Sequence, residues 1–181
     1  MKRLLCLVCA AGALFLSTEA RAQFANHSVG AQLGFLDLDQ VGGVIDWGLP
    51  VGITTSNYID AGFEWTFALS GMLLTVHPVG GEVNQVIGVT GGPGIRYLFL
   101  EESLRPYVGA ELNYLHIFFG NLGVDWTSNY VGIGPFAGID YFVGDTASVG
   151  VKAQFNVYAT LTNRVELQTS KGIFVTGAAW F

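Results

Sequence analysis

The stretch NYIDAGFEWTFAL, residues 57–69, alternates between two kinds of side chain. One set is apolar and mostly large: Ile59, Ala61, Phe63, Trp65, Phe67 and Leu69. The residues between them are small, polar or charged: Asp60, Gly62, Glu64, Thr66 and Ala68. Successive side chains of a β-strand point to opposite faces. This period of two therefore predicts a strand over 57–69 with one apolar face and one polar face.

The same period recurs along the chain, as in SVGAQLGF (28–35) and ASVGVKAQFNVYAT (147–160). With the turn signals between such runs, the sequence predicts an all-β chain of eight strands. We place them at 28–37, 43–53, 57–69, 86–99, 106–118, 129–143, 147–159 and 171–181.

The connections between these predicted strands differ in length. Those after the second, fourth and sixth strands are short, as at LEESLRP (100–106) and VGDTA (143–147). Those after the third, fifth and seventh are longer, at 70–85, 119–128 and 161–170, and only the first connection, around 39–42, is too short for the pattern. Short turns at one end and long loops at the other are typical of an antiparallel up-and-down transmembrane β-barrel.

Two kinds of eight-stranded barrel fit the alternation. A soluble, lipocalin-like barrel points its apolar side chains inward, whereas a membrane barrel points them outward. The polar face carries only a few charges of both signs, at Asp60, Glu64, Arg96, Glu111, Asp140 and Lys152. The surface of a soluble barrel is usually much richer in Lys and Glu. We therefore predict a membrane barrel with a polar lumen, and keep a soluble periplasmic barrel as the structural alternative.

The N-terminal stretch MKRLLCLVCAAGALFLSTEARA has the three parts of a secretory signal peptide. It begins with two basic residues, continues with an apolar run over 4–16 and ends in Ala20-Arg21-Ala22. The run is too short to span a bilayer, which needs about 20 residues. We predict cleavage after Ala22, with residues 1–22 as the signal peptide and 23–181 as one barrel domain.

The predicted mature chain has no cysteine, because Cys6 and Cys9 both lie in the signal peptide. Removing Lys2, Arg3, Arg21 and Glu19 leaves five basic and 13 acidic residues. A chain this acidic has no basic patch for nucleic acid, so we expect no nucleic-acid partner.

The chain ends in GIFVTGAAWF, with the aromatic pair Trp180 and Phe181 last. Together with the predicted signal peptide and strands, this end resembles the small OmpA/OmpX-type outer-membrane β-barrel family of Gram-negative bacteria. The resemblance implies that Phe181 is recognised by the barrel-assembly machinery, with apolar residues at alternate positions before it. Here those positions hold Ala179, Gly177, Val175 and Ile173, of which Gly177 and Ala179 match weakly.

The predicted lumen gives three functional alternatives. A salt-bridged plug is favoured, in which Arg96 and Lys152 pair with the inward acids, among them Asp46 and Asp60, because eight strands leave little room for water. The second is a narrow channel for small or apolar solutes or cations. The third is a lipid A-modifying barrel enzyme.

The sequence offers no catalytic or metal site. Lipid A deacylases, which are outer-membrane barrels, carry a catalytic His and Ser two residues apart, but His116 has Phe118 at that spacing. No histidine pair has ligand spacing, so we predict no metal and no cofactor. GVTGGPG (88–94) lacks the Lys-Ser/Thr of a phosphate loop and predicts a strand with a bulge or bend. Pro135 likewise predicts a bulge or a shifted strand boundary.

Aromatic residues gather near the predicted strand ends, as the girdles of a membrane barrel require. They are Trp47, Tyr58, Trp65, Tyr97, Tyr107, Tyr114, Trp126, Tyr130, Tyr141 and Trp180. We therefore expect a non-enzymatic, monomeric outer-membrane barrel. Its expected partners are outer-membrane lipid, lipopolysaccharide and the barrel-assembly machinery, and its loops at 70–85, 119–128 and 161–170 face the exterior.

Overall fold

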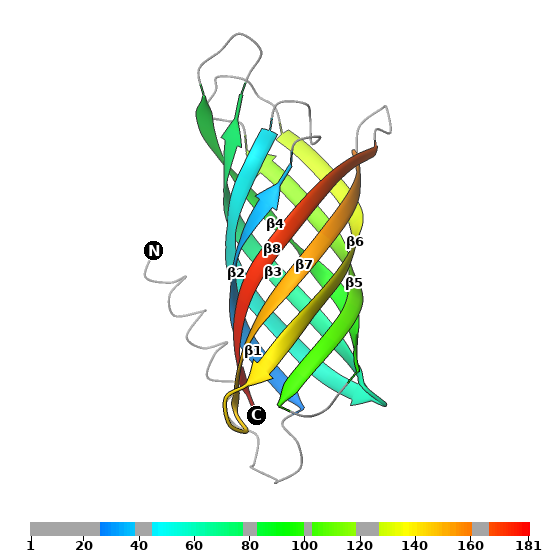
Figure 1. The fold of residues 1–181 in the computed structure, drawn as a ribbon. Coiled ribbons are helices and arrows are strands. Elements are labelled where there is room, and N and C mark those ends of the chain that lie inside the picture. Colours follow the sequence, from blue (N-terminus) through cyan, green and yellow to red (C-terminus); the bar gives the residue numbers. More distant parts are fainter. Residues whose placement is uncertain (1–25, 39–44, 78–82, 100–102, 119–126, 161–166) are drawn as a thin grey trace, which may run out of the picture.

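In the computed structural model the chain forms a closed barrel of eight strands, each paired with its sequence neighbours, and the last strand is paired with the first (Figure 1). The structure describes residues 26–38, 45–77, 83–99, 103–118, 127–160 and 167–181. The predicted all-β, antiparallel, up-and-down fold is confirmed. No helix in these ranges is long and apolar enough to cross a membrane. The predicted signal peptide, 1–22, lies outside the described residues.

The strands are β1 (His27–Asp37), β2 (Ile45–Asp60), β3 (Phe63–Val76), β4 (Asn84–Leu98), β5 (Leu104–Phe118), β6 (Thr127–Phe142), β7 (Ala147–Thr160) and β8 (Leu167–Trp180). The strands β2, β4, β6 and β8 end at the same end of the barrel as the C-terminus, which we call the turn end (Figure 1). The strands β1, β3, β5 and β7 end at the other end, the loop end. All three predicted long loops are too long, because β3 runs on to Val76, β6 already begins at Thr127 and β8 already begins at Leu167.

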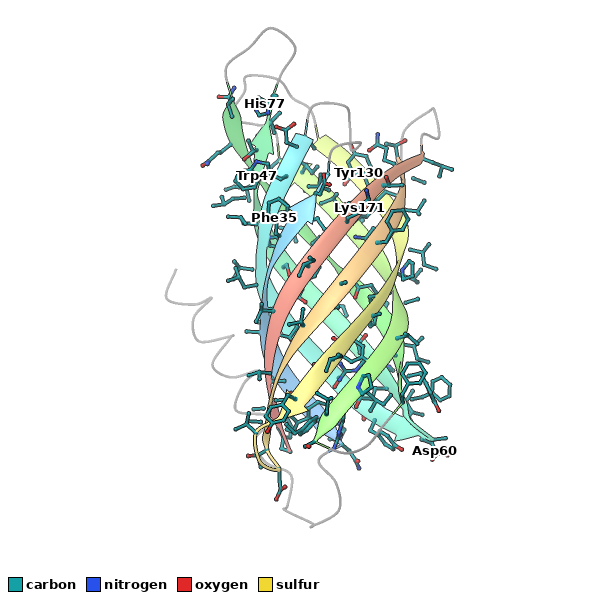
Figure 2. The ribbon with its side chains drawn as sticks, viewed as in Figure 1. Phe35, Trp47, Asp60, His77, Tyr130 and Lys171 are labelled. Carbon is teal, nitrogen blue, oxygen red and sulfur yellow. The ribbon has the colours of Figure 1, made fainter. Side chains whose placement is uncertain are left out.

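The outer face of the barrel is apolar. Large aliphatic side chains in the middle of several strands, such as Leu33, Ile53 and Val175, are 57–60% exposed there. Figure 2 shows side chains standing out from the barrel on both sides of the view. A continuous apolar band of this kind is stable in lipid and not in water. The apolar face therefore points outward, as predicted, and the lipocalin-like arrangement is wrong.

The predicted strand over 57–69 is in fact a hairpin. Ala61 and Gly62 have positive φ angles of 50° and 84°, as both central residues of a type I′ turn do. The chain reverses there between β2 and β3, and Ile59 is an extra residue in β2, because Tyr58 pairs with Glu64 while Asp60 pairs with Phe63.

The prolines within the strands do not cause bulges. At Pro135 the pairing of β6 with β7 is interrupted for two residues, but the register is the same on both sides. Pro93, within the stretch 88–94, has the same effect on the pairing of β4 with β5. The predicted bulges are therefore wrong. A proline lacks a backbone N–H, so it removes a hydrogen bond from the ladder without shifting the register.

Candidate functional site

The lumen is the candidate functional site, and it is filled differently along its length. At the loop end lies an apolar plug of buried side chains: Leu36, Leu38, Ile45, Met72, Leu74, Val76, Val86, Leu115, Ile117, Tyr130, Tyr158 and Phe174. Toward the turn end lies a charged cluster: Glu64, Arg96, Glu111, Asp140 and Lys152. The lumen predicted as polar is therefore largely apolar at the loop end and charged toward the turn end.

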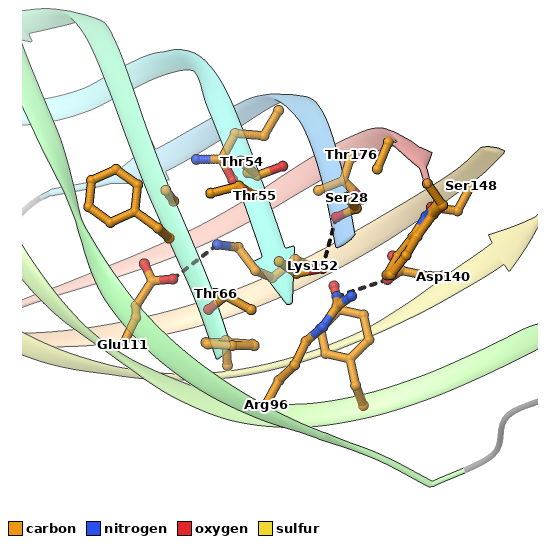
Figure 3. Close-up of a pocket in the computed structure, with 18 residues that line it drawn as sticks. Ser28, Thr54, Thr55, Thr66, Arg96, Glu111, Asp140, Ser148, Lys152 and Thr176 are labelled. Carbon is orange, nitrogen blue, oxygen red and sulfur yellow. Dashed lines mark hydrogen bonds and ion pairs between the residues drawn. The ribbon is translucent and has the colours of Figure 1, made fainter. Parts of the chain in front are cut away.

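Arg96 on β4 joins two acids, Glu64 on the neighbouring strand β3 and Asp140 on β6. Its Nε donates to Glu64 Oε2 at 2.6 Å, and its Nη1 donates to Asp140 Oδ2 at 2.8 Å. The side chains of Glu64 and Asp140 are 1% and 7% exposed. The Tyr107 ring lies 4.6 Å from the guanidinium carbon. Two buried carboxylates thus depend on one cation, because a buried charge is tolerated only when it is paired. Figure 3 shows the pair of Arg96 with Asp140.

Lys152 on β7 and Glu111 on β5 form the second part of the charged cluster. Lys152 Nζ lies 3.4 Å from Glu111 Oε2, and the other oxygen of Glu111 accepts a hydrogen bond from Gln154 at 2.5 Å (Figure 3 shows the Lys152–Glu111 pair). The ammonium group also lies 4.7 Å from the centre of the Phe174 ring, which belongs to the apolar plug. Lys152 therefore stands where the charged and apolar parts of the lumen meet.

The turn end of the lumen is closed by aromatic side chains. Trp180 is 4% exposed, its Nε1 donates to Ser148 Oγ at 2.8 Å, and its ring lies 5.1 Å from that of Phe142. The Arg105 guanidinium lies 3.9 Å from the centre of the Phe142 ring. Arg105 falls within the turn predicted over 100–106, although it alternates in phase with the inward Tyr107 and so belongs to the lumen.

Two of the acids predicted to face inward are not in the lumen. Asp60 lies exposed at the turn end, where its Oδ1 accepts a hydrogen bond from the backbone N–H of Ala61 at 2.8 Å (Figure 2). Asp46 lies at the loop end, partly exposed and in contact with His77. With Arg105 added, the described part of the lumen holds three cations and three acids. The lumen is therefore balanced in charge and not acidic.

A layer of amides lies between the charged cluster and the plug. Asn113 Nδ2 donates to Asn156 Oδ1 at 2.7 Å, and Asn156 Nδ2 donates to Ser170 Oγ at 3.0 Å. Gln154 Nε2 is shared between Asn156 and the carboxylate of Glu111. These contacts connect β5, β7 and β8 across the lumen, so the polar side chains form one network with the charged cluster.

Small cavities remain beside this network. One of about 60 Å³ lies between Arg96, Lys152 and the hydroxyl side chains of Ser28, Ser56 and Thr176 (Figure 3). Another, of about 20 Å³, adjoins the amide layer. One water needs roughly 10–15 Å³ measured in this way, so these spaces suit a few waters. Gln32 lines both, and its buried Oε1 has no protein partner.

Inside the barrel, some glycines lie directly opposite aromatic residues of the neighbouring strand. A Cβ atom at Gly138 would collide with the Tyr107 ring, and one at Gly109 would collide with the Phe136 ring. The glycines of the inner face therefore make room for large rings on the neighbouring strand. Three aromatics predicted for the girdles, Tyr107, Tyr130 and Trp180, are 3–4% exposed and belong to this inner packing.

The outer aromatics fit the girdle prediction better. Trp65, Tyr97, Tyr114 and Tyr141 are 37–51% exposed on the outer face. Trp126 lies outside the described residues. His116 also faces outward, alternating in phase with Tyr114 and not with the inward Leu115. No group of three or more His, Cys, Asp and Glu side chains in the described ranges is placed to hold a metal.

The last two residues of the chain face opposite ways. Phe181 is 43% exposed on the outer face, whereas Trp180 points into the lumen. Phe181 and His27 exchange both backbone hydrogen bonds, at 3.0 and 3.1 Å, so the ends of the barrel sequence meet at the seam between β8 and β1.

No protein-family model matches the chain, and no curated protein matches it in sequence. Solved structures do match. Neisserial surface protein A aligns with a TM-score of 0.62 at 18% identity, over 86% of this chain and 97% of that one. The outer membrane protein AlkL aligns at 0.56 and 12%, over 91% and 94%. The outer membrane protein OprG from Pseudomonas aeruginosa aligns at 0.54 and 11%, over 90% and 97%. At these identities the likeness establishes the fold.

Proposed function

We propose that this chain, which has the fold of the small eight-stranded outer-membrane β-barrels, is a non-enzymatic integral protein of the outer membrane with a sealed lumen. Its role is then structural or interactive, and it acts through the loop end that faces the exterior. The apolar outer band supports the membrane location, because lipid is the solvent that such a band requires.

The observation that carries this proposal is the filling of the lumen. The apolar plug crosses it at the loop end, and the charged cluster with Trp180 and Phe142 fills it toward the turn end. The larger cavity between them is only about 60 Å³. The balanced charges of the described lumen residues also give no excess of either sign to favour one kind of ion.

Planar-bilayer recording on the refolded protein tests the sealed lumen. We expect no unitary conductance, since opening a path would require both the apolar plug and the ion pairs of Arg96 to move. Heat-modifiable gel migration of the same sample confirms that the barrel is folded. Discrete conductance steps that change when Glu64 is replaced by Gln would contradict the proposal and favour a channel.

The non-enzymatic part of the proposal needs a separate test. Lipid A extracted from cells with and without the gene is compared by mass spectrometry. We expect the same species in both, because no described histidine has a serine nucleophile two residues away. A species that appears only when the gene is present would make the protein a lipid-modifying enzyme.

We further propose that Phe181 is the signal for the barrel-assembly machinery and that the assembled barrel is a monomer. The outward position of Phe181 at the turn end supports this role. Deleting Phe181 should lower the amount of heat-modifiable barrel in the outer membrane several-fold. Leu167→Ala is the matched control, since Leu167 is 74% exposed at the loop end of the same strand. Equal assembly of the deletion variant and the wild type would refute the proposed signal.

A further inference from the structure

Three polar side chains form a hydrogen-bonded group on the outer face near the loop end. They are Tyr114 and His116 on β5 and Asn129 on β6, and we call them the polar trio. His116 and Asn129 are direct partners across the two strands. Toward the middle of the barrel the adjacent outer face is apolar, with Leu112 and Ile133 58% and 53% exposed. A polar group among such neighbours requires its own explanation, because lipid tails offer it no hydrogen bonds.

The hydrogen bonds fix which atoms of the trio remain available. The Tyr114 hydroxyl and His116 Nδ1 lie 2.5 and 2.7 Å from Asn129 Oδ1. An amide oxygen only accepts, so both groups donate to it. In the neutral imidazole this leaves His116 Nε2 as an acceptor, and the Asn129 amide nitrogen still carries its two N–H donors. The trio therefore presents donors and an acceptor side by side.

Aromatic rings flank these polar atoms. The His116 ring lies 4.2 Å from that of Phe118, edge to face, and is nearly parallel to the Tyr114 ring at 6.4 Å. Amphipathic rings beside hydrogen-bonding groups suit a ligand that has C–H faces and hydroxyl edges, as a sugar does. A phosphate would instead favour cations, and the described outer face near the loop end offers only Lys171, on another part of the barrel.

The position of the trio matches the headgroup region. His116 precedes the end of β5 at Phe118 by two residues, about 7 Å along a strand that rises roughly 3.4 Å per residue. Because barrel strands tilt by about 40°, the depth along the barrel axis is smaller. The trio thus lies at the level where the loop end leaves the hydrocarbon core.

At the opposite rim of the barrel, the described outer face carries a group of aromatic rings instead. At the turn end the outer face carries Phe63, Tyr97 and Phe99, whose rings contact one another at 5.0 and 5.4 Å. The only polar side-chain atom of these three residues is the Tyr97 hydroxyl. The two leaflets of an outer membrane also differ from each other. The outer leaflet carries sugar headgroups, which match the hydrogen-bonding trio, whereas the inner leaflet carries phospholipid.

We propose that the polar trio is a binding site for the sugar headgroup of an outer-leaflet glycolipid, of the lipid A type. Asn129 donates to sugar hydroxyl or amide oxygens, His116 Nε2 accepts from a hydroxyl, and the Tyr114 and Phe118 rings flank the sugar. This inference rests on the proposed function, since it needs the loop end to lie in the outer leaflet.

Native mass spectrometry of the refolded full-length barrel tests this site, with purified lipid A and phosphatidylglycerol as probes. We expect the wild type to bind lipid A in preference to phosphatidylglycerol. Asn129→Leu and His116→Leu should each weaken the binding of lipid A about tenfold, as the loss of one or two hydrogen bonds predicts. Tyr97→Leu, which alters the outer face at the turn end, is the matched control and should bind lipid A like the wild type.

The outcomes separate this inference from the proposed function. Heat-modifiable migration of every variant shows that the barrel is folded. If Asn129→Leu binds lipid A as the wild type does, or if the wild type binds both lipids equally, the glycolipid site is refuted while the sealed outer-membrane barrel stands. Discrete conductance of the wild type would contradict the sealed lumen and leave the lipid measurements valid.

Discussion

The two ends of the lumen solve the same packing problem with different chemistry. At the loop end, Leu74, Leu115 and Ile117 are fully buried among other apolar side chains and need only a matching shape. Toward the turn end, Glu64 and Asp140 are just as buried but need the guanidinium of Arg96. Removing one partner of a buried ion pair leaves an unpaired charge, whereas trimming an apolar side chain leaves a cavity. The charged end should therefore be the more sensitive to a single substitution.

The largest effect is expected for Arg96→Met. This change leaves the carboxylates of Glu64 and Asp140 buried without their cation, and the cost of breaking a buried pair is about 3–5 kcal/mol. Urea unfolding of the barrel in lipid vesicles should show a loss of this size in the free energy of unfolding.

A matched variant separates charge from volume at this position. Combining Arg96→Met with Glu64→Gln and Asp140→Asn removes all three charges and keeps similar side-chain volumes. We expect this triple variant to recover much of the lost stability, because neutral amides cost less to bury than charges. A triple variant no more stable than Arg96→Met would mean that the packing of Arg96 on Tyr107, and not its charge, is what matters.

The apolar end should respond less strongly to a comparable change. Leu115→Ala removes a fully buried side chain from the plug and should cost about 2–4 kcal/mol through lost burial and a residual cavity. The same urea titration measures it, with Leu112→Ala on the outer face as the control in the same strand. A loss for Leu115→Ala larger than that for Arg96→Met would reverse the order proposed for the two ends.

The difference between the apolar and the charged end of the lumen also explains where alternation predicted the strands correctly and where it did not. Over 28–35 and 147–160 one face is lipid-exposed and the other polar, and the predicted strands match β1 and β7 closely. Over 70–76 both faces are apolar, because Leu73 faces lipid while Met72 and Leu74 enter the plug. The period of two disappears there, so the alternation predicts a loop where β3 continues.

The alternation did not predict the hairpin turn inside 57–69, and the reason there is different. The two residues that flank a two-residue turn pair with each other and face the same side of the sheet. Because they are three positions apart, odd- and even-numbered residues normally exchange faces across such a turn. Here the extra residue Ile59 restores the phase, so Tyr58 and Glu64 both face inward on either side of the turn. The sequence therefore reads as one uninterrupted strand through Ala61 and Gly62.

A third, intermediate effect is expected where rings and glycines meet in the lumen. Gly138→Ala places a methyl group against the Tyr107 ring, which in turn supports Arg96. Overpacking of this kind costs about 1–3 kcal/mol, and urea unfolding should show it. Gly71→Ala is the control, because a Cβ atom at Gly71 meets no other atom within 4 Å. If the two substitutions have equal effects, the glycines of the inner face are not there to make room for rings.

The lumen partners could be predicted only in part. Alternation placed Glu64, Arg96, Glu111, Asp140 and Lys152 on the inner face, and the structure brings all five together below the plug. Which acid meets which cation depends on the stagger of the strands around the closed barrel, and a single strand's sequence does not contain that information. For this reason the pairing of Arg96 with Asp140, which lies two strands away, appears only in the structure.

The smallest effect is expected at Asp60, the one predicted lumen acid that the hairpin places outside. Asp60→Asn keeps the oxygen that accepts from the Ala61 N–H and removes only the charge. At this exposed position the free energy of unfolding should change by no more than about 0.5 kcal/mol. Glu64→Gln is the informative comparison, since Glu64 is four residues away, 1% exposed and paired with Arg96, and neutralising it should cost several times more. Equal losses for the two variants would place Asp60 in the lumen after all, and the uninterrupted strand over 57–69 would then be the better description of this stretch.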